Sequence, residues 1–179
     1  METLSHEKTK NKRSKYLALI LRHKPELFNL ELMPNGWIQV AQLLNNTDFT
    51  MDELEEIVTT DTKGRYQFSE EKQFIRAVQG HSAKVKIEFK EFVPTKELYH
   101  GTAERFFDSI LRDGIKKMSR QFVHLSKDIE TAKKVGERHG KVKIIAIDAV
   151  KMYNDGYKFF IAENGVILTD FVPTKYFKY

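Results

Sequence analysis

Apolar positions near the N-terminus recur with helical spacing. Residues 14–25 read SKYLALILRHKP, and the apolar positions among them form one face of an amphipathic helix. Pro25 disfavours helical backbone at the residue before it, so Arg22, His23 and Lys24 fall in the last turn. Cationic groups there complement the negative end of the helix dipole, and the alternative is that they bind an anion such as phosphate. The pattern alone leaves both interpretations open.

The rest of the N-terminal half predicts two more helices and a hairpin. We expect helices over residues 37–44 and 50–60, and strands over 65–68 and 73–78 joined by a polar loop. Thr50 followed three residues later by Glu53 is a capping-box pattern. Three helices followed by a two-stranded hairpin indicate a winged-helix lobe, a fold that often but not always binds nucleic acid.

Short strand patterns dominate the C-terminal half. We expect strands over 83–92, 98–102, 122–126 and 142–147, and helices over 128–137 and over 103–112, the latter with Phe106, Phe107, Ile110 and Leu111 facing inward. Asn164-Gly165 between two apolar runs predicts a hairpin with a primed turn. Many short strands with two helices indicate a compact mixed sheet in an α+β fold. Residues 93–96 mark the boundary, so we expect domains 1–92 and 93–179, packed together with a cleft between them.

Composition narrows the function classes. The chain has 179 residues, of which 41% are apolar, and it has no cysteine, which excludes disulfides and thiol catalysis. Its first fifteen residues lack the apolar core of a signal peptide, and no run approaches the roughly 18 apolar residues of a membrane span. We therefore expect a cytoplasmic protein with no membrane partner. A net charge of +5 permits a polyanionic partner without demanding one.

Two strand ends carry candidate chemistry where common enzyme motifs are missing. The chain has neither a Gly-x-Gly-x-x-Gly fingerprint nor a Walker loop, and its six histidines are dispersed without His-Glu-x-x-His, so we predict no metal. His100-Gly101-Thr102 and His124-Leu125-Ser126 each set an imidazole and a hydroxyl on one side of an extended segment. Such groups could bind the ribose hydroxyls and amide of a nucleotide, although a histidine that ends a strand is often structural.

The N-terminal hairpin adds a second set of polar residues. Arg65 begins it and Arg76 lies in its second strand, and the hairpin ends in Gln79-Gly80-His81-Ser82. A glycine beside His81 lets backbone N–H groups approach an anion closely. A plain strand-to-loop exit explains the same residues, so the hairpin alone does not decide the function.

Six ordered motifs together resemble a single family. They are Leu21-Arg22-His23-Lys24-Pro25, Arg65-Tyr66-Gln67-Phe68, Ile75-Arg76-Ala77-Val78-Gln79-Gly80-His81-Ser82, Tyr99-His100-Gly101-Thr102, Met118-Ser119-Arg120-Gln121-Phe122-Val123-His124-Leu125-Ser126 and Ala162-Glu163-Asn164-Gly165-Val166. In this order they resemble the RNA 2′-phosphotransferase family, the bacterial KptA-type relatives of the tRNA-splicing enzyme. The resemblance extends from about Ser14 to the C-terminus.

This resemblance implies a fold and a reaction. The fold would be a winged-helix lobe packed on a lobe of the NAD-dependent ADP-ribosyltransferase type. The partners would be NAD, as a consumed cosubstrate, and RNA with an internal 2′-phosphate. That phosphate would attack the nicotinamide ribose C1″ and expel nicotinamide, forming a 2′-phospho-ADP-ribosyl RNA intermediate. Ribose O2″ would then attack phosphorus and release 2′-OH RNA and ADP-ribose 1″,2″-cyclic phosphate. We expect a monomer.

The resemblance also assigns residues. The family's catalytic set falls on Arg22, His23, Arg65 and Arg120, and fixed guanidinium groups can stabilise phosphate charge without metal. We expect Arg22 and His23 to face Arg120 across one pocket. The cofactor-binding set falls on His100, Gly101, Thr102, Gly114, His124, Ser126 and Arg138. We place Arg76, Gln79, Gly80, His81 and Ser82 in an RNA- or phosphate-binding set. Glu163 is not assigned as the glutamate of protein-modifying relatives, because a hairpin position explains it.

Two other functions are open to the sequence. A DNA-binding regulator is disfavoured, because the helix over 50–60 carries Asp52, Glu53, Glu55 and Glu56 and no base. An ADP-ribosyltransferase that caps nucleic-acid 5′-phosphates or modifies protein would use the same site without the ring-closing step. Release of the cyclic phosphate would identify the phosphotransferase, and a stable ADP-ribosyl adduct would identify the transferase.

Overall fold

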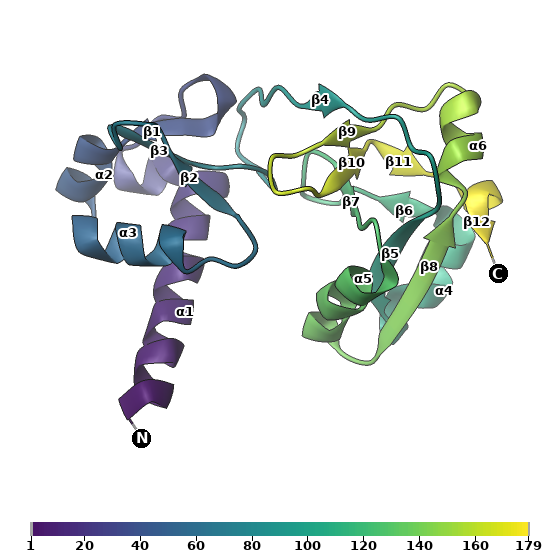
Figure 1. The fold of residues 1–179 in the computed structure, drawn as a ribbon, viewed down its shortest axis with the longest axis horizontal. Helices are drawn as coiled ribbons and strands as arrows, with labels where there is room; N and C mark the ends of the chain where they lie inside the picture. Colours follow the sequence, from purple (N-terminus) through teal and green to yellow (C-terminus); the bar gives the residue numbers. More distant parts are fainter. Residues whose placement is uncertain (1, 179) are drawn as a thin grey trace. The chain divides into compact units, whose positions relative to one another are not determined.

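A computed structural model describes residues 2–178, with side chains from residue 9 onward except at 139. The chain forms two compact units, Met1–Glu88 (unit 1) and Phe89–Tyr179 (unit 2), each with its own hydrophobic core (Figure 1). Both combine helices with small sheets, which confirms the α+β class. The predicted mixed sheet is wrong, since every ladder between the described strands is antiparallel. None of the described helices is long and apolar enough to cross a membrane.

Unit 1 surrounds a three-stranded sheet with helices. Its elements are α1 (Glu2–Arg22), 3-10 helices at Pro25–Phe28 and Pro34–Gly36, β1 (Trp37–Gln39), α2 (Val40–Asn46), α3 (Met51–Thr59), β2 (Tyr66–Phe68) and β3 (Phe74–Ala77). The strands follow the order β1-β3-β2. Leu17, Ile20 and Leu21 of α1 are fully buried in the core of this unit. The apolar face read from the sequence is therefore the face that α1 buries.

Two predictions for unit 1 are confirmed and one is wrong. Thr50 and Glu53 form the reciprocal capping box at the start of α3, and β2 pairs with β3 as a hairpin. The helix expected over 37–44 begins only at Val40. Its first three residues form β1, which pairs with β3 so that Trp37 lies opposite Arg76. The segment is too short for its own residue pattern to determine its secondary structure. Pairing with β3, a strand far along the chain, makes it a strand.

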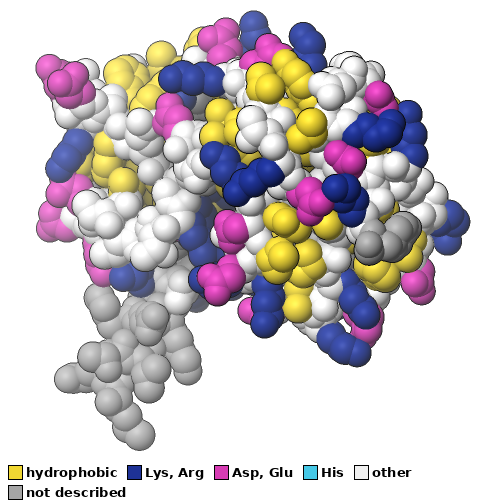
Figure 2. Space-filling view, turned by 45° about the vertical axis from the view of Figure 1, so that its right-hand side comes forward, with side chains coloured by type: hydrophobic (Ala, Val, Ile, Leu, Met, Phe, Trp, Pro, Cys, Tyr) yellow, Lys and Arg dark blue, Asp and Glu magenta, His cyan; other side chains and the backbone are white. Residues whose placement is uncertain are grey.

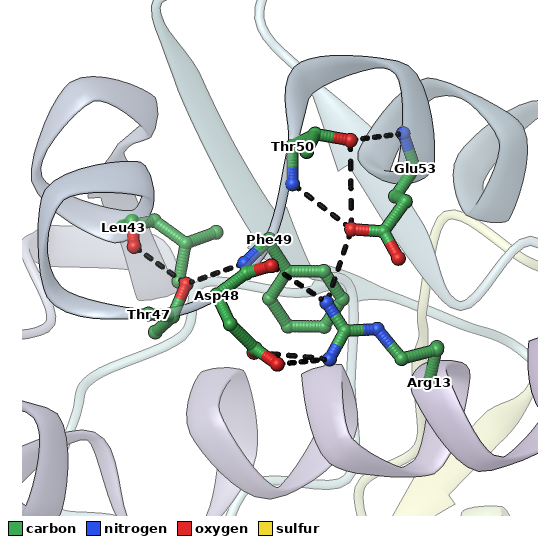
Figure 3. A network of polar contacts seen from close by, with 7 residues as sticks. All are labelled: Arg13, Leu43, Thr47, Asp48, Phe49, Thr50 and Glu53. Carbon is green, nitrogen blue, oxygen red and sulfur yellow. Dashed lines mark hydrogen bonds and ion pairs between the residues drawn. The ribbon is translucent and has the colours of Figure 1, made fainter.

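A polar network joins α1 to the start of α3 (Figure 3). The Arg13 guanidinium donates to both carboxylate oxygens of Asp48 and to Glu53 Oε2, each at 3.0 Å, and it lies 4.0 Å from the centre of the Phe49 ring. Glu53 Oε2 also accepts the Thr50 backbone N–H at 3.0 Å. The Thr50 N–H, and then Arg13, lower the pKa of Glu53. The capping box is thus part of a contact between helices.

The described part of unit 2 forms three α-helices, two 3-10 helices and three small sheets. Its elements are β4 (Lys90–Glu91), β5 (Leu98–Ala103), α4 (Glu104–Asp113), β6 (Ile115–Lys116), β7 (Val123–Leu125), α5 (Ile129–Gly136), a 3-10 helix (Glu137–His139), β8 (Val142–Ile147), α6 (Ala149–Asn154), β9 (Phe160–Ile161), β10 (Ile167–Thr169), β11 (Phe171–Val172), a 3-10 helix (Thr174–Tyr176) and β12 (Phe177–Lys178). The sheets have the orders β4-β9-β10-β7, β11-β6 and β12-β8-β5. The strand expected over 142–147 is confirmed, whereas α6 was not predicted.

The strand expected over 83–92 is wrong except at β4. Side chains still alternate there, with Val85 and Ile87 half-buried and Lys84 and Lys86 exposed. The backbone makes single contacts instead of a ladder: the Lys86 carbonyl accepts the Asn35 N–H at 3.1 Å. An alternating pattern shows which side chains are buried. The segment that carries it forms a strand only where a neighbouring strand is present to pair with its backbone.

The hairpin between β9 and β10 is confirmed, but its turn differs from the predicted primed type. A primed Asn-Gly turn needs positive φ at both residues, and only Gly165 has it, at 81°. Gly165 N–H donates to the Ala162 carbonyl, and Ala162 N–H donates to the Val166 carbonyl. This is a three-residue loop in which glycine takes the left-handed position.

Helix α5 packs directly on the sheet of β5 and β8 (Figure 1). A Cβ added to Gly101 in β5 would lie 1.7 Å from the Ala132 carbonyl oxygen of α5. A Cβ added to Gly136 at the end of α5 would lie 2.4 Å from Val142 Cγ2 of β8. The helix therefore approaches the strand as closely as two backbones allow.

Candidate active site

The C-terminus of α1 is fixed by the segment that follows β3. The Arg22 carbonyl accepts the backbone N–H groups of Ser82 at 2.9 Å and Ala83 at 3.0 Å. His23 is exposed, and its Nδ1 lies 2.9 Å from Ser82 Oγ. A hydroxyl can donate to a neutral imidazole and accept from a charged one, so this contact suits both protonation states of His23.

Arg22 and Arg65 lie close together in the same unit. Arg22 Nη2 donates to the Arg65 carbonyl at 3.5 Å, and its guanidinium lies 5.7 Å from the centre of the Tyr66 ring. Arg65 Nη1 is 3.3 Å from Asp61 Oδ1, and the Arg65 N–H donates to the other carboxylate oxygen. The Asp61 side chain is only 6% exposed. A buried carboxylate thus orients Arg65, whose backbone carbonyl contacts the Arg22 guanidinium.

Arg76 makes internal contacts in this unit. Its Nε and Nη2 donate to Gln67 Oε1 at 3.0 and 2.8 Å, and its guanidinium lies 4.4 Å from the centre of the Trp37 ring. These contacts tie the three strands of the sheet together across their faces. They give Arg76 a structural role, whatever further contact it makes with a substrate.

His81 is buried rather than displayed to a ligand. Its side chain is 1% exposed, and within the described part of the chain neither ring nitrogen has a hydrogen-bond partner. Burial, and then the charges of Arg22, His23 and Arg76, lower the pKa of His81 to about 4. Gln79 is buried as well, and Ser82 is exposed. His81 therefore stays neutral at neutral pH, which limits the positive charge in this part of unit 1.

The buried His81 should make the stability of unit 1 depend on pH. Unfolding restores an ordinary pKa near 6.5, so between that value and about 4 the unfolded chain binds more protons than the folded chain. The stabilisation is complete above pH 6.5 and is lost as pH falls toward 4, by about 3 kcal/mol in all. Urea unfolding followed through Trp37, the single tryptophan, reports on this unit. His81→Met should flatten the slope; an unchanged slope in that variant would contradict the assignment.

A cavity of about 550 Å³ opens in unit 2. This volume is within the range of small-molecule sites. Of the predicted cofactor-binding residues, five line it: His100, Gly101, Thr102, Gly114 and His124. Arg120 lines it too. The cavity is therefore formed by β5, the end of α4 and the segment from β6 to β7, and it combines apolar walls with a few polar groups.

The polar groups of the cavity contact one another. Arg120 Nη1 lies 3.1 Å from His124 Nδ1, and His100 Nδ1 donates to the His124 carbonyl at 3.1 Å. Burial lowers the pKa of His100, and the positive charge of Arg120 lowers it further. The hydrogen bond to the His124 carbonyl acts in the opposite direction and raises the pKa. The Arg120 side chain keeps contact with solvent. Desolvation by the surrounding protein, and then the positive charge of Arg138, lower the pKa of Arg120. Arg120 nevertheless remains charged at neutral pH.

Two predicted cofactor residues do not line this cavity. Ser126 uses its backbone N–H and carbonyl to bridge Tyr99. Arg138 is close enough for its charge to act on Arg120. Of the predicted catalytic set, Arg22, His23 and Arg65 belong to unit 1 and Arg120 to unit 2. That the four residues serve one phosphate stays a prediction.

Some cavity residues were missed by the sequence analysis. Phe106, expected in the core, is 46% exposed and lines the cavity with Met118, which is 84% exposed. Lys116 and Lys117 also line it. A helical apolar pattern cannot separate a core face from a cavity face. The sequence signal that could have indicated the cavity is Met118, an apolar residue beside Lys116 and Lys117 in the segment after Gly114.

Charged groups elsewhere are mixed in sign. On the face drawn in Figure 2, Lys and Arg side chains are interspersed with Asp and Glu. Among the residues that the structure describes, no three His, Cys, Asp or Glu side chains are placed to hold a metal ion. The two clusters around Arg22 and Arg120 are thus distinguished by their contacts rather than by a broad basic surface.

Comparison with known proteins places the chain in a family. A sequence model of the "RNA 2′-phosphotransferase, Tpt1 / KptA family" matches residues 8–171. The chain belongs to this family. A probable RNA 2′-phosphotransferase of Fusobacterium nucleatum is 51% identical over 174 residues, covering 94% of this chain and 97% of the relative. Proteins of the same description from Flavobacterium johnsoniae and Nostoc punctiforme are each 46% identical, covering 93% and 91% of this chain and 94% and 93% of the relative.

Family membership makes the protein a transferase of the RNA 2′-phosphotransferase type, as the ordered motifs predicted. The matched region includes all the predicted site residues in both units. The roles of the individual residues stay predictions, and the contacts above state what each is placed to do.

Proposed function

We propose that this RNA 2′-phosphotransferase consumes NAD and transfers an internal RNA 2′-phosphate to it in two steps. The observation that carries the proposal is the cavity of about 550 Å³ with Arg120 and two histidines on its wall. Apolar walls such as Phe106 and Ile110 suit planar rings, and Thr102 and the imidazoles suit ribose hydroxyls and an amide. These residues fit NAD, which would supply an activated ribose carbon with nicotinamide as leaving group.

The residues of the chain have distinct tasks in this scheme. His100, Thr102 and the cavity walls bind and orient the cosubstrate. In the first step the RNA 2′-phosphate forms a bond to the ribose C1″, and the C1″–nitrogen bond to nicotinamide breaks. In the second, ribose O2″ bonds to phosphorus and the RNA 2′-oxygen leaves. We propose that Arg22, Arg65 and Arg120 stabilise the charge on the phosphate and that His23 takes the proton of O2″, while the departing RNA 2′-oxygen gains a proton from water to become 2′-OH.

The proposal extends to the folds of the two units. Unit 1, with three helices and a three-stranded antiparallel sheet ending in a hairpin, suits a winged-helix lobe. Unit 2, with small sheets around a cavity at the end of β5, suits an ADP-ribosyltransferase-like lobe. The substrate would be RNA with an internal 2′-phosphate, as in tRNA splicing.

The test is a product analysis with chelator present. The purified chain is incubated with NAD and a 2′-phosphorylated oligonucleotide, with and without EDTA, and mass spectrometry follows both products. We expect nicotinamide, 2′-OH RNA and ADP-ribose 1″,2″-cyclic phosphate in both mixtures, because guanidinium groups supply the positive charge. A 5′-phosphorylated oligonucleotide without the 2′-phosphate is the control. A stable ADP-ribosyl adduct, or activity lost with EDTA and restored by a divalent ion, would contradict the proposal.

A further inference from the structure

The contact between Arg120 and His124 fixes the proton of the imidazole. A guanidinium has N–H donors and no acceptor, so at 3.1 Å from Arg120 Nη1 the His124 Nδ1 must be the acceptor. The His124 ring is therefore neutral, with its proton on Nε2. The same residue accepts the His100 Nδ1–H at its backbone carbonyl. His124 thus receives one hydrogen bond at the ring and one at the backbone from two cavity residues.

The two partners of this contact have unequal support in the fold. His124 is the middle residue of β7 and pairs with Leu168 of β10, so its ring projects from a sheet position. Arg120 lies in the loop from β6 to β7, where its backbone N–H donates to the Lys117 carbonyl. An arginine side chain has many rotamers, and the position of Arg120 in a loop does not restrict it to one of them. The His124 ring is held by the sheet, so its hydrogen bond can restrict Arg120 to one rotamer.

We propose that His124 is a positioning residue for Arg120, in addition to being part of the cavity wall. It holds the guanidinium in the orientation in which it meets the substrate phosphate. This inference rests on the proposed function in one respect, namely that Arg120 contacts the substrate phosphate. The hydrogen bond itself belongs to the protein without substrate, so its effect on Arg120 can be measured separately from catalysis.

Three substitutions of His124 separate positioning from cosubstrate binding. Asn places its Oδ1 acceptor on Cγ, where His carries Nδ1; Gln places its acceptor one bond further along, and Leu has none. Because His124 also lines the cavity, all three substitutions can change KM for NAD. Beyond that shared change, we expect His124→Leu and His124→Gln to slow the second step about tenfold, the effect of one hydrogen bond. His124→Asn should recover most of the rate. In a double-mutant cycle, His124→Leu should add nothing to Arg120→Ala.

The deciding readout is nitrogen-15 NMR of the Arg120 guanidinium, combined with the rates. We expect slowed rotation of the Arg120 Nη groups in the parent protein and in His124→Asn, and free rotation in His124→Leu. Circular dichroism melting checks that each variant is folded. Equal rotation in all variants, or a second step slowed as much in His124→Asn as in His124→Leu, would overturn the positioning role. A parent protein that does not convert 2′-phosphorylated RNA would refute the proposed function and leave the NMR test valid.

Discussion

Replacing Arg65 or Arg120 by alanine should let RNA that carries ADP-ribose on its 2′-phosphate accumulate. In the first step the phosphate dianion is a competent nucleophile and nicotinamide an activated leaving group, so positioning supplies much of the rate. In the second step a neutral hydroxyl attacks an anionic phosphodiester, which requires proton removal and charge stabilisation at phosphorus. Each lost guanidinium should slow that step by about 10²–10³-fold.

A time course that separates substrate, intermediate and product RNA on a gel measures this effect. Arg112→Ala is the matched control, because the Arg112 side chain is 72% exposed, forms an ion pair with Asp113 and does not line the cavity. Thr102→Val should weaken NAD use and give no intermediate, because Thr102 lines the cavity. Arg65→Ala also leaves the buried Asp61 carboxylate without that partner, so Trp37 fluorescence must show that unit 1 is folded. If both arginine variants slow the two steps equally, the division of roles is wrong.

A single methyl group on Gly101 should unfold the sheet of β5 and β8. The added Cβ would lie 1.7 Å from the Ala132 carbonyl oxygen, and backbone cannot rotate away as a side chain does. Helix α5 would have to leave the sheet, at a cost above about 3 kcal/mol. Hydrogen exchange with mass spectrometry should show lost protection in β5, α5 and β8, while Trp37 reports an intact unit 1.

Gly165→Ala is the control for this prediction. Gly165 has a φ of 81° but no atom within 4 Å of an added Cβ, so only backbone strain of about 1–2 kcal/mol applies. Its effect should be confined to the loop between β9 and β10. Equal losses in the two variants would mean that strain, rather than the contact of α5 with β5, governs the result.

The sequence predicted those elements whose cause is local. The α3 cap needs only Thr50 and Glu53, and β8 is apolar at every position except Lys143, so both appear where expected. Elements decided by distant partners were missed. Trp37–Gln39 is a strand because β3 lies beside it, and residues 83–89 are not a strand although their side chains alternate. The pattern of apolar and polar residues along the chain indicates which side chains are buried, but it does not show which strands pair.

The candidate site follows the same division. Ordered motifs were enough to find the family, because each motif is a local run of residues. They could not show that His81 is buried and neutral, that Asp61 orients Arg65, or that Phe106 faces a cavity. Those facts depend on which segments meet in three dimensions. Residue types in a motif therefore indicate the chemistry, and the contacts decide which of them touch a ligand.

The close packing of α5 on β5 gives the cavity two walls with different freedom to evolve. The β5 wall, with His100, Gly101 and Thr102, is also the surface on which a helix packs, so most substitutions there change folding as well as binding. The loop from β6 to β7 has exposed side chains, and its residues other than Arg120, such as Met118, carry no proposed catalytic role. Divergence in ligand preference among descendants of this chain should therefore begin in the loop, and laboratory selection for altered substrates should start with a library there.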